Sequence, residues 1–547
     1  MRRTIELTSY AEVVLAPAIS DAIHPAFSNL FVQTELLQPL QAILCTRRSR
    51  SSEEVAPWMC HLLAVHQVDI DSISYETDRR RFIGRGRSIV QPAAMDATPD
   101  DQGLLSNSAG AVLDPIVAIR CRITLDPDQS ATIDLVTGVS DSREGCLQLI
   151  DKYRDRHLAD RVFDLAWTHS QVLRRQFNIS QVDAQLYEHL ATSVIYANAA
   201  YRAEAGVLAA NQRNQSGLWG HGVSGDLPIV LLQIHAAENI ELVRQSVQAH
   251  TYWRMKGLAV DLVIWNEDRA GYRQHLHDLI MGLIASGIDA SLIDRPGRVF
   301  VRLAQQLSNE DRTLMQSVAR IILSDDHGSL AEQVHRRRVD PPLPQFEQNL
   351  PRLFETTPPQ PAPKQGELIL CNPYGGFTAD GREYSITLMP GEATPAPWVN
   401  VLANPGFGTV ISESGSAYTW SENAHEFRLT PWQNDPVGDA CGEALYLRDE
   451  VTGHYWSPTL LPRRGHGAYM TRHGFGYSVF EHNEDSIHTE LWVYVALDAP
   501  IKFYRLRIRN DSGRLRRLSA TGYVEWVLGD LREKSAMHVV TEFDPLS

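Results

Sequence analysis

The sequence predicts an α+β multidomain protein with β-sandwich regions at both ends and, between them, a helical segment and a small α/β domain with a parallel sheet. Three features of the sequence lead to this prediction. Short apolar runs separated by polar, glycine or proline residues fill both ends, strand and helix patterns alternate over residues 228–330, and eight prolines lie in residues 341–363. A chain of 547 residues is also longer than one hydrophobic core usually supports.

The first two predicted regions cover residues 1–140 and 141–227. We interpret residues 1–140 as a β-sandwich region because they contain short strand-like runs, at positions 5–7, 13–15, 42–44 and 131–136. In residues 141–227, apolar side chains recur at helical spacing with charges between them. This spacing predicts helices over residues 142–167, 180–198 and 202–211. Ser180 and Asp183 resemble a capping box in which Asp replaces the usual Glu.

Residues 228–330 are predicted to form the small α/β domain. Strand patterns at 229–234, 258–264 and 299–303 alternate with helical patterns at 238–256, 272–286 and 309–323. This order implies a parallel sheet with right-handed crossovers. The first strand is followed by His235-Ala-Ala rather than by a glycine-rich loop, so we expect no nucleotide site there.

A linker over residues 331–366 and a second β region over residues 367–547 complete the predicted organisation. Proline lacks a backbone donor and favours extended conformations, which suits a linker. The prolines are Pro341, Pro342, Pro344, Pro351, Pro358, Pro359, Pro361 and Pro363. In the second β region, strand patterns lie at 368–370, 384–388, 490–495 and 503–509. The last of them alternates apolar and basic residues, as a half-exposed strand does.

Composition and charge argue against several classes of function. A formal net charge of −15 argues against a nucleic-acid binder, which needs a basic face. No apolar run reaches the roughly 18 residues of a membrane span, and no apolar stretch follows the basic start as in a signal peptide. The cysteines are widely spaced, which is typical of reduced thiols in a cytoplasmic protein: Cys45, Cys60, Cys121, Cys146, Cys371 and Cys441.

We therefore expect a cytoplasmic chain that binds neither a cofactor nor a metal ion. The single His-x-His pair, His275 and His277, falls in a predicted helix, where side chains two positions apart do not share a face. Two ligands of one metal ion need such a common face.

The two β regions share the string T-x-Y-x-E-x-V-L. It covers residues 8–15 and 521–528, and each occurrence is followed by V-x-T-E, at residues 32–35 and 539–542. Two matches in the same order predict two copies of one module. We interpret residues 1–140 as the back half of copy one and residues 367–547 as a truncated copy two, within a fragment of a larger polypeptide. Our hypothesis is that the two halves complement each other in one sandwich.

Aromatic and polar side chains gather in glycine- and proline-rich stretches of residues 372–477. Aromatic faces stack on the C–H surfaces of sugar rings, while planar amide, carboxylate and guanidinium groups bind pairs of hydroxyls. Tryptophans of a sandwich core beside polar turns would give the same composition, so both interpretations stay open on composition alone. The candidate sugar-binding residues are Trp398, Asn400, Tyr418, Trp420, Arg428, Trp432, Asn434, Asp435, Arg472 and His473.

Longer motifs in this region help to decide between a sugar-binding site and a sandwich core. They are Trp398-Val-Asn400, Ser412-Glu-Ser-Gly-Ser-Ala-Tyr418, Arg428-Leu-Thr-Pro-Trp-Gln-Asn-Asp-Pro-Val437, Trp456-Ser-Pro458, Arg472-His-Gly474 and Tyr523-Val-Glu-Trp526. As a set they resemble the N-terminal supersandwich of the cellobiose-phosphorylase family of glycoside hydrolases, formerly glycosyltransferase family 36. The resemblance implies that an (α/α)6 barrel supplies the catalytic Asp. The chain stops before that barrel, so we expect no catalytic residue in it.

The first half of the chain carries a second set of motifs. They are Tyr75-Glu-Thr-Asp-Arg79, Phe82-Ile-Gly-Arg85, Leu113-Asp-Pro115, Ala166-Trp-Thr-His-Ser-Gln171 and residues 215–228. This half resembles the region upstream of the supersandwich in the cyclic β-1,2-glucan synthases of the family. The resemblance implies a large inner-membrane enzyme of β-glucan metabolism, of which this chain is a carbohydrate-binding or structural portion. Its implied partners are β-glucan or gluco-oligosaccharide, and the missing barrel or other synthase modules.

Two other functions stay open at this point. One is an independently active β-glucoside phosphorylase or transglycosylase that uses Asp226 or an acid of the sandwich. Asp226 ends the run Gly-Val-Ser-Gly-Asp, where a carboxylate that caps the turn is the alternative interpretation. The other is a non-catalytic interaction module for a barrel-containing partner. Glucose-1-phosphate release or sugar transfer would favour the first, and co-purification with such a partner the second.

Overall fold

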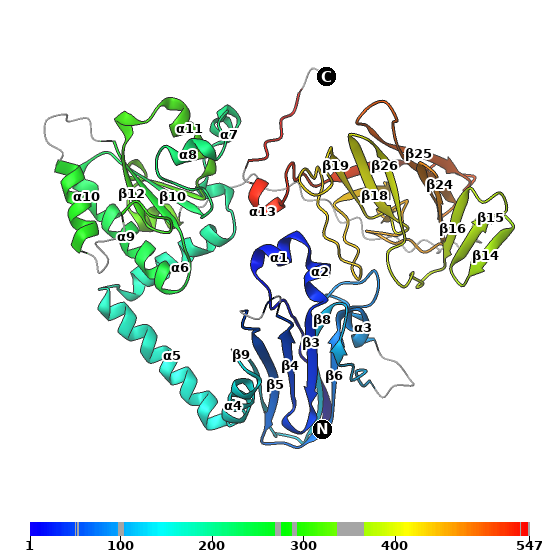
Figure 1. The fold of residues 1–547 in the computed structure, drawn as a ribbon, viewed down its shortest axis with the longest axis horizontal. Coiled ribbons are helices and arrows are strands. Elements are labelled where there is room, and N and C mark those ends of the chain that lie inside the picture. Colours follow the sequence, from blue (N-terminus) through cyan, green and yellow to red (C-terminus); the bar gives the residue numbers. More distant parts are fainter. Residues whose placement is uncertain are drawn as a thin grey trace. The chain divides into compact units, whose positions relative to one another are not determined.

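Strands dominate both ends of the chain and helices its middle, which confirms the predicted α+β class (Figure 1). The computed structural model describes residues 1–49, 51, 54–96, 103–267, 275–286, 293–335, 366–536 and 538–544. Contacts divide the chain into one unit of Met1–Val162 with Gln348–Ala536, and another of Phe163–Glu347 with Met537–Ser547. The prolines of the predicted linker lie outside the described residues. Within the described ranges, no helix is both long and apolar enough to cross a membrane.

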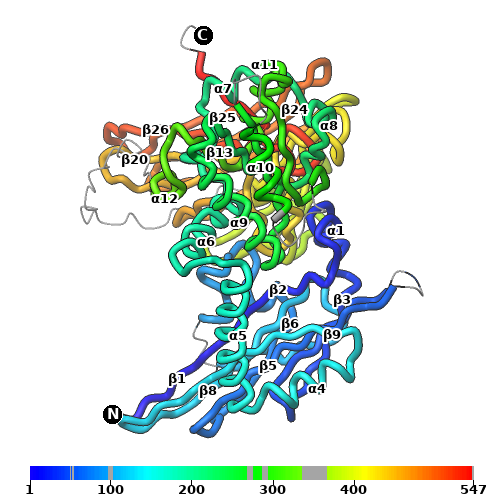
Figure 2. Tube along the Cα trace, turned by 90° about the vertical axis from the view of Figure 1, so that its left-hand side faces the viewer, coloured from blue at the N-terminus to red at the C-terminus, as the bar shows by residue number. Residues whose placement is uncertain are grey.

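Two antiparallel sheets form the N-terminal part of the first unit. One has the order β7-β3-β4-β5-β9, and the other the order β1-β8-β2 with β6 also paired to β8. Figure 2 shows these strands running beside one another. Their bounds are β1 Arg3–Thr8, β2 Ala11–Glu12, β3 Val32–Leu37, β4 Ala42–Arg47, β5 Trp58–His66, β6 Ile70–Asp78, β7 Gly110–Ala111, β8 Pro115–Leu125 and β9 Thr132–Ser140.

Alternation along β5 explains how this part packs. Successive side chains of a strand point to opposite faces of its sheet. Leu63 therefore packs in the core between the sheets, together with Tyr75 of β6. Its neighbour Leu62 faces the other way and packs with Cys146 and Ile150 of a covering helix. The helices of this part are α1 Ala18–Ile23, α2 Pro25–Asn29, α3 Arg79–Ile83 and α4 Arg143–Tyr153.

Three sheets form the C-terminal part of the first unit. Their strand orders are β14-β15-β16-β22-β23-β24-β25, β17-β18-β19 and β21-β20-β26. Ile411 of β18 packs with Phe480 and Leu491 of the seven-stranded sheet in one core. The bounds are β14 Leu368–Asn372, β15 Gly375–Thr378, β16 Glu383–Leu388, β17 Val399–Asn404, β18 Phe407–Ser412, β19 Ala417–Ser421, β20 Glu443–Asp449, β21 Tyr455–Trp456, β22 Tyr469–Gly474, β23 Tyr477–Glu484, β24 Ile487–Val495, β25 Lys502–Asn510, β26 Leu518–Val524 and the helix α13 Arg532–Ser535.

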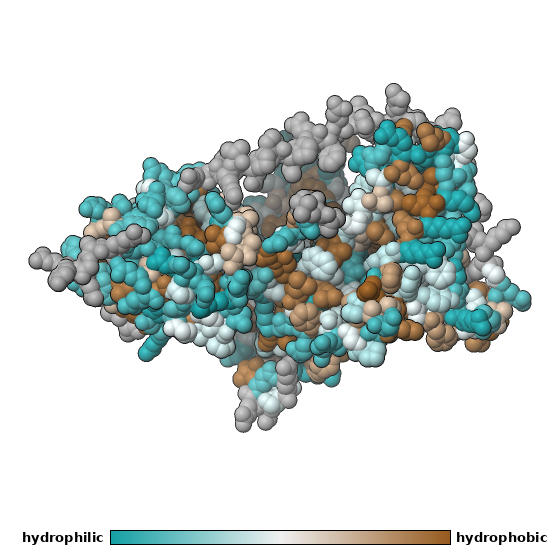
Figure 3. All heavy atoms as spheres, turned by 90° about the horizontal axis from the view of Figure 1, so that it is seen from above, coloured by the Kyte–Doolittle hydropathy of each residue, from teal (hydrophilic) through white to brown (hydrophobic). Residues whose placement is uncertain are grey.

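Two strands at the ends of these sheet orders keep apolar side chains at the surface. Phe503 and Ile508 of β25 and Val524 of β26 are exposed. On the face of the molecule seen in Figure 3, hydrophobic side chains (brown) lie among hydrophilic ones (teal). The half-exposed strand predicted for residues 503–509 is exposed on both faces, because Phe503 and Ile508 point to opposite sides and only Leu506 packs against a core.

A four-stranded parallel sheet with the order β12-β11-β10-β13 is the centre of the second unit. Helices cover both faces, because Val230 and Leu232 of β10 pack on one side and Leu231 on the other (Figure 1). The strands are β10 Ile229–Ile234, β11 Asp261–Asn266, β12 Val299–Leu303 and β13 Ile321–Ser324. The helices are α5 Arg156–Gln176, α6 Gln181–Ile195, α7 Ala205–Ala210, α8 Ser216–Trp219, α9 Ile240–Met255, α10 His275–Ser286, α11 Asn309–Val318 and α12 Leu330–His335.

The structure corrects the predicted helix over residues 309–323. α11 ends at Val318, and Ile321–Ser324 forms a strand that pairs in parallel with β10. Ala319 after α11 has extended backbone angles, and Ile321 is fully buried opposite Val230. A short apolar run gives no period by which a buried strand differs from a buried helix end.

The boundaries of other predicted helices and strands also differ from those in the structure. The predicted helix over 142–167 is two helices, α4 and α5, and the strand expected over 258–264 begins at Asp261. Ser180 caps α6 as expected, because its hydroxyl accepts a hydrogen bond from the Asp183 amide at 3.0 Å. The first three residues of the helix predicted over 272–286 lie outside the described residues. All six cysteines are free.

The two copies of the T-x-Y-x-E-x-V-L string have the same local geometry. In each, the tyrosine hydroxyl donates to the glutamate two positions later, and the final leucine has a positive φ. The hydrogen bonds are Tyr10 to Glu12 at 2.8 Å and Tyr523 to Glu525 at 2.7 Å, and the φ angles are 46° at Leu15 and 52° at Leu528. A positive φ is uncommon at leucine, so this match supports the predicted repeat. The V-x-T-E strings differ, since residues 32–35 lie in β3 and residues 539–542 are in no strand.

The two β regions of the first unit make contact without sharing a sheet. Among the described strands, those before residue 141 pair only with one another, and so do those after residue 366. Val437 packs with Phe82 and Ile83, and its carbonyl accepts a hydrogen bond from the Gly86 amide at 2.7 Å. The loop that carries Val437 therefore joins the two regions.

Candidate functional site

A hollow of about 460 Å³ lies where this loop meets the N-terminal β region. Its lining is rich in carboxylates and guanidinium groups and contains one indole. The charged lining residues are Glu12, Asp21, Arg79, Asp114, Arg428, Asp435, Asp530, Arg532 and Glu533, and the indole is that of Trp432. Such a lining offers an apolar surface beside planar hydrogen-bonding groups, which is the combination that sugars require.

Backbone bonds at Arg428 fix the start of the loop. The Arg428 amide donates to the Gly529 carbonyl at 2.8 Å, and the Gly529 amide donates back to the Arg428 carbonyl at 3.1 Å. The Arg428 side chain is buried, with its guanidinium 5.4 Å from the centre of the Trp432 ring. At this distance a guanidinium over an indole is a favourable cation–π contact.

Trp432 lies between two hollows. Its ring stacks on Tyr418 with centroids 5.4 Å apart and planes at 25°, and it meets the edge of His24 at 5.4 Å. A second hollow, of about 350 Å³, is lined by Tyr418, Trp432, Asn434 and Asp435. Trp432, Asn434 and Asp435 line both hollows, so one loop faces both spaces.

Arg79 holds the loop against the N-terminal β region. Its Nη1 and Nη2 donate to the two oxygens of Asp435 at 2.7 and 3.1 Å. The same guanidinium donates to Asp114 at 3.0 Å and to Glu12 at 3.0 Å. A two-point pair between a planar guanidinium and a carboxylate fixes both position and orientation.

Asp435 and Asp114 share one arginine, but their pKa values shift in opposite directions. Burial alone would raise the pKa of Asp435, but its hydrogen bonds and charge interaction with Arg79 outweigh burial and lower that pKa. Burial raises the pKa of Asp114, and Arg79 only partly offsets this. Of the two carboxyl groups, Asp114 is therefore the one that holds a proton more readily, while Asp435 stays an anion.

Five of the ten predicted sugar-binding residues line these hollows: Tyr418, Arg428, Trp432, Asn434 and Asp435. Trp420 packs behind them, 5.3 Å from Tyr418, and closely covers Gly408. A β-carbon at Gly408 would meet the Trp420 ring, so only glycine fits there. Trp420 thus supports the hollow without lining it.

The other four predicted residues hold strands together elsewhere in the C-terminal part. The Asn400 amide donates to the carbonyls of Gly474 and Tyr477, both at 2.9 Å. The His473 ring bonds Ser478 at 2.9 Å and the Trp398 carbonyl at 3.1 Å, and burial lowers the pKa of His473 to about 4.

The rings of Tyr374 and Tyr384 pack edge-on against Trp398. Arg472 forms ion pairs of 2.8 Å with Glu383 and with Glu481. Asn400, Arg472 and His473 give their polar groups to other parts of the protein. None of the four residues lines the hollows around Trp432.

Sequence reasoning did not select Arg79, Asp114 or Glu12 as site residues. Each lies in a motif named above. Arg79 ends the motif Tyr75–Arg79, Asp114 lies in Leu113-Asp-Pro115, and Glu12 belongs to the repeated string. What the sequence cannot supply is the pairing of Arg79 with a residue 356 positions away. Asp226 lies exposed in the second unit, where Gln215 donates to it at 3.1 Å, outside these hollows.

Comparison with known proteins identifies related sequences. The family described as "Glycosyl hydrolase 94, supersandwich domain" matches residues 1–156 and 382–547. The cyclic beta-(1,2)-glucan synthase NdvB of Rhizobium meliloti is 34% identical over 551 residues, covering 99% of this chain and 19% of that protein. The N,N'-diacetylchitobiose phosphorylase of Vibrio proteolyticus is 32% identical over 168 residues, covering 30% of this chain and 21% of the relative.

The solabiose phosphorylase of Paenibacillus borealis is 28% identical over 163 residues, covering 28% of this chain and 20% of the relative. The chain thus spans only about a fifth of the length of each of these relatives. Supersandwich sequence lies at both ends of the chain, before and after the parallel-sheet segment Phe163–Glu347 of the second unit. Together these matches support a carbohydrate-related function.

Proposed function

Because the chain belongs to the glycosyl hydrolase 94 supersandwich family, we propose that it is the carbohydrate-binding and structural portion of a larger enzyme of the cyclic β-1,2-glucan synthase type. The hollow around Trp432 carries this proposal. It brings an indole, an amide and anchored carboxylates to one surface, and the loop that supplies them is held by Arg79 and Arg428. A rigid set of such groups suits a neutral sugar chain.

In this proposal each group has a distinct task. Trp432 gives an apolar wall for sugar C–H groups, and Asn434, which lines both hollows, offers hydrogen-bonding atoms to hydroxyls. Asp435 adds only Oδ2, because its Oδ1 already accepts from Arg79 and from the amides of Val437 and Gly438. Arg79 positions Asp435 and does not need to touch the sugar. The reacting groups belong to a barrel outside this chain, so the chain binds and presents β-glucan without converting it.

Titration calorimetry with linear β-1,2-gluco-oligosaccharides, run beside an assay of glucose-1-phosphate release in phosphate buffer, tests the proposal. We expect binding without turnover. Trp432→Ala should weaken that binding at least about fivefold, because an aromatic wall contributes about 1 kcal/mol or more. Trp219→Ala is the matched control, since Trp219 is an exposed tryptophan of the second unit and should leave affinity unchanged.

Other results would point to the two alternative functions. Turnover by the chain alone would identify an independently active phosphorylase or transglycosylase. Absence of both binding and turnover would leave an interaction module for a barrel-containing partner. Equal loss of affinity in the Trp432 and Trp219 variants would place the sugar elsewhere.

A further inference from the structure

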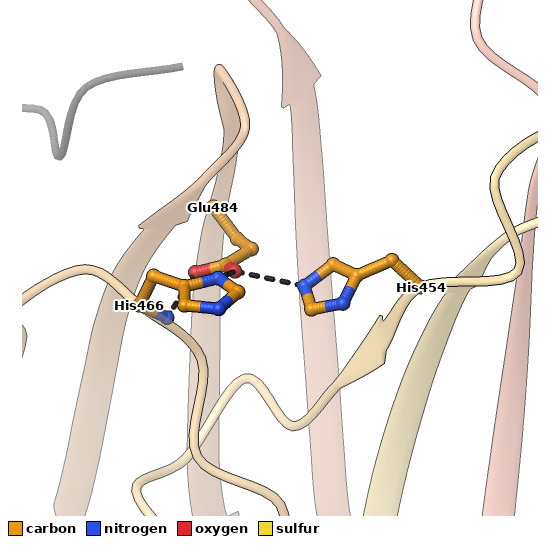
Figure 4. Close-up of side chains that lie close together, drawn as sticks. All are labelled: His454, His466 and Glu484. Carbon is orange, nitrogen blue, oxygen red and sulfur yellow. Dashed lines mark hydrogen bonds and ion pairs between the residues drawn. The ribbon is translucent and has the colours of Figure 1, made fainter. Parts of the chain in front are cut away.

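Two histidines and a glutamate converge in the C-terminal part of the first unit, away from the hollow around Trp432. His454 precedes β21, His466 lies in the loop before β22, and Glu484 ends β23. Figure 4 shows both imidazole rings directed at the same carboxylate. Three separate segments of chain therefore meet at one point.

The geometry around Glu484 is close and largely buried. His454 Nε2 lies 2.8 Å and His466 Nδ1 lies 2.6 Å from the same oxygen, Oε1. One ligand atom from each residue lies within 4.8 Å of the others. The Glu484 side chain is 1% exposed, whereas that of His466 is 75% exposed. An ion from solvent can therefore reach the buried Glu484 carboxylate beside the exposed imidazole of His466.

Five nitrogen atoms are directed at this carboxylate. Besides the two imidazoles, Oε2 faces His482 Nε2 at 3.1 Å and accepts hydrogen bonds from the backbone amides of His466 and Gly467 at 2.7 and 3.3 Å. An imidazole nitrogen that carries no proton cannot donate to a carboxylate oxygen. A cation held by Oε1 and the two imidazole nitrogens would bind all three ligand atoms with both rings neutral.

His482 and the two amides complete the surroundings that a metal ligand needs. The other ring nitrogen of His482 bonds the Ala468 carbonyl at 3.0 Å, and the ring stacks on Tyr469 at 3.7 Å. These contacts orient Oε2 and leave Oε1 directed at the imidazoles. Such outer partners fix the orientation of ligating carboxylates in metal sites.

A second group of this kind, His235 with Asp325 and Asp326, is less suited to hold a cation. Asp325 already caps the backbone amides of His235 and Ala236 and bonds Asn239. Asp326 is 69% exposed and lies 3.7 Å from His235. This group is explained by the turn that it stabilises.

We propose that His454, His466 and Glu484 form a binding site for a divalent transition-metal ion of the Zn²⁺ type, with a fourth position open to water. Two imidazoles and one carboxylate without thiolates suit Zn²⁺. The ion would clamp the segments before β21 and β22 to the end of β23. This inference is independent of the sugar site, since none of its residues lines the hollows around Trp432.

Zn²⁺ titration of the chelator-treated full chain, without an added histidine tag, tests the site. We expect one ion per chain with a Kd below about 10 µM, and at least about tenfold weaker binding in His454→Ala and in His466→Ala. Co²⁺ in place of Zn²⁺ should give the visible absorption of a four-coordinate ion. His425→Ala is the control, because His425 also pairs with a glutamate, Glu426, at 2.8 Å on the surface.

His466 is exposed, so His466→Ala should keep the fold even if His454→Ala does not. Binding that is weaker than the stated limit, or that is equally tight in wild type and in His466→Ala, would overturn the site. Loss of Zn²⁺ binding in His466→Ala with unchanged oligosaccharide affinity would support it and show that the two sites are separate.

Discussion

The hollow around Trp432 and the strand contacts around Asn400 contain the same kinds of residue in opposite surroundings. Asn434 borders open space, whereas Asn400 and His473 give their polar groups to backbone and side chains of neighbouring strands. Both sets look alike in the sequence. An aromatic and amide-rich motif therefore indicates a binding site only when the protein itself does not satisfy the hydrogen bonds of the motif's polar groups.

The largest effect should come from Arg79→Ala. It removes the shared cation from Asp435, Asp114 and Glu12, of which the first two are largely buried. Unpairing buried carboxylates should lower the free energy of unfolding by about 3 kcal/mol and weaken oligosaccharide binding as the loop loosens. Denaturant unfolding and calorimetry measure the two effects. Arg81→Ala, on the same helix but 58% exposed, should change stability by less than about 0.5 kcal/mol.

Asn400→Ala should separate stability from binding. Its loss leaves the carbonyls of Gly474 and Tyr477 short of donors, so we expect a destabilisation of about 2 kcal/mol with unchanged sugar affinity per folded molecule. Asn434→Ala is the matched variant, for which we expect the reverse. If both variants affected stability and affinity alike, the division between the two groups would be wrong.

The pH dependence of stability should carry a smaller contribution from His473. Its pKa is about 4 in the folded chain because burial disfavours the charged ring, and near the ordinary 6.5 when unfolded. Between these values the unfolded state binds more protons, so stability falls as the pH drops. From pH 7 to 5.5, wild type should lose about 1 kcal/mol more than His473→Gln. Urea melts at both pH values measure this, with exposed His157→Gln expected to follow wild type.

Arg472→Lys should have the smallest effect. Lysine keeps the charge between Glu383 and Glu481 but loses the planar fork. We expect a loss of about 0.5 kcal/mol at low salt that shrinks as salt screens the pairs. Thermal melts at low and high ionic strength check this. A loss that stays the same in high salt would mean that Arg472 packs rather than pairs.

Sequence patterns predicted those parts of the fold that depend on local periodicity. The buried runs at Ile229–Ile234 and Val299–Leu303 are strands at the expected positions, and Ser180 caps its helix. The fourth parallel strand, Ile321–Ser324, was missed because it follows a helix after two residues. Four apolar or small residues carry too little periodicity to mark that change.

The candidate site was predicted in part for a similar reason. Trp432 and Asp435 stand close together in the sequence with other aromatic and polar residues, so their loop could be selected. Arg79 could not be assigned to it, because tertiary contacts such as the packing of Val437 on Phe82 and Ile83 bring the two segments together. A contact between remote segments has no local signal, whereas a cap or an alternating strand has one.

The division of the chain also bears on the order in which it folds. The first unit combines Met1–Val162 with Gln348–Ala536, and its Arg79–Asp435 pair joins residues 356 positions apart. A ribosome adding about 5–20 residues per second needs roughly 18–70 s to make the intervening stretch. During that time Arg79 lacks its partner Asp435, while most of the second unit has already been synthesised. The first unit therefore has a high contact order and should finish folding after the second.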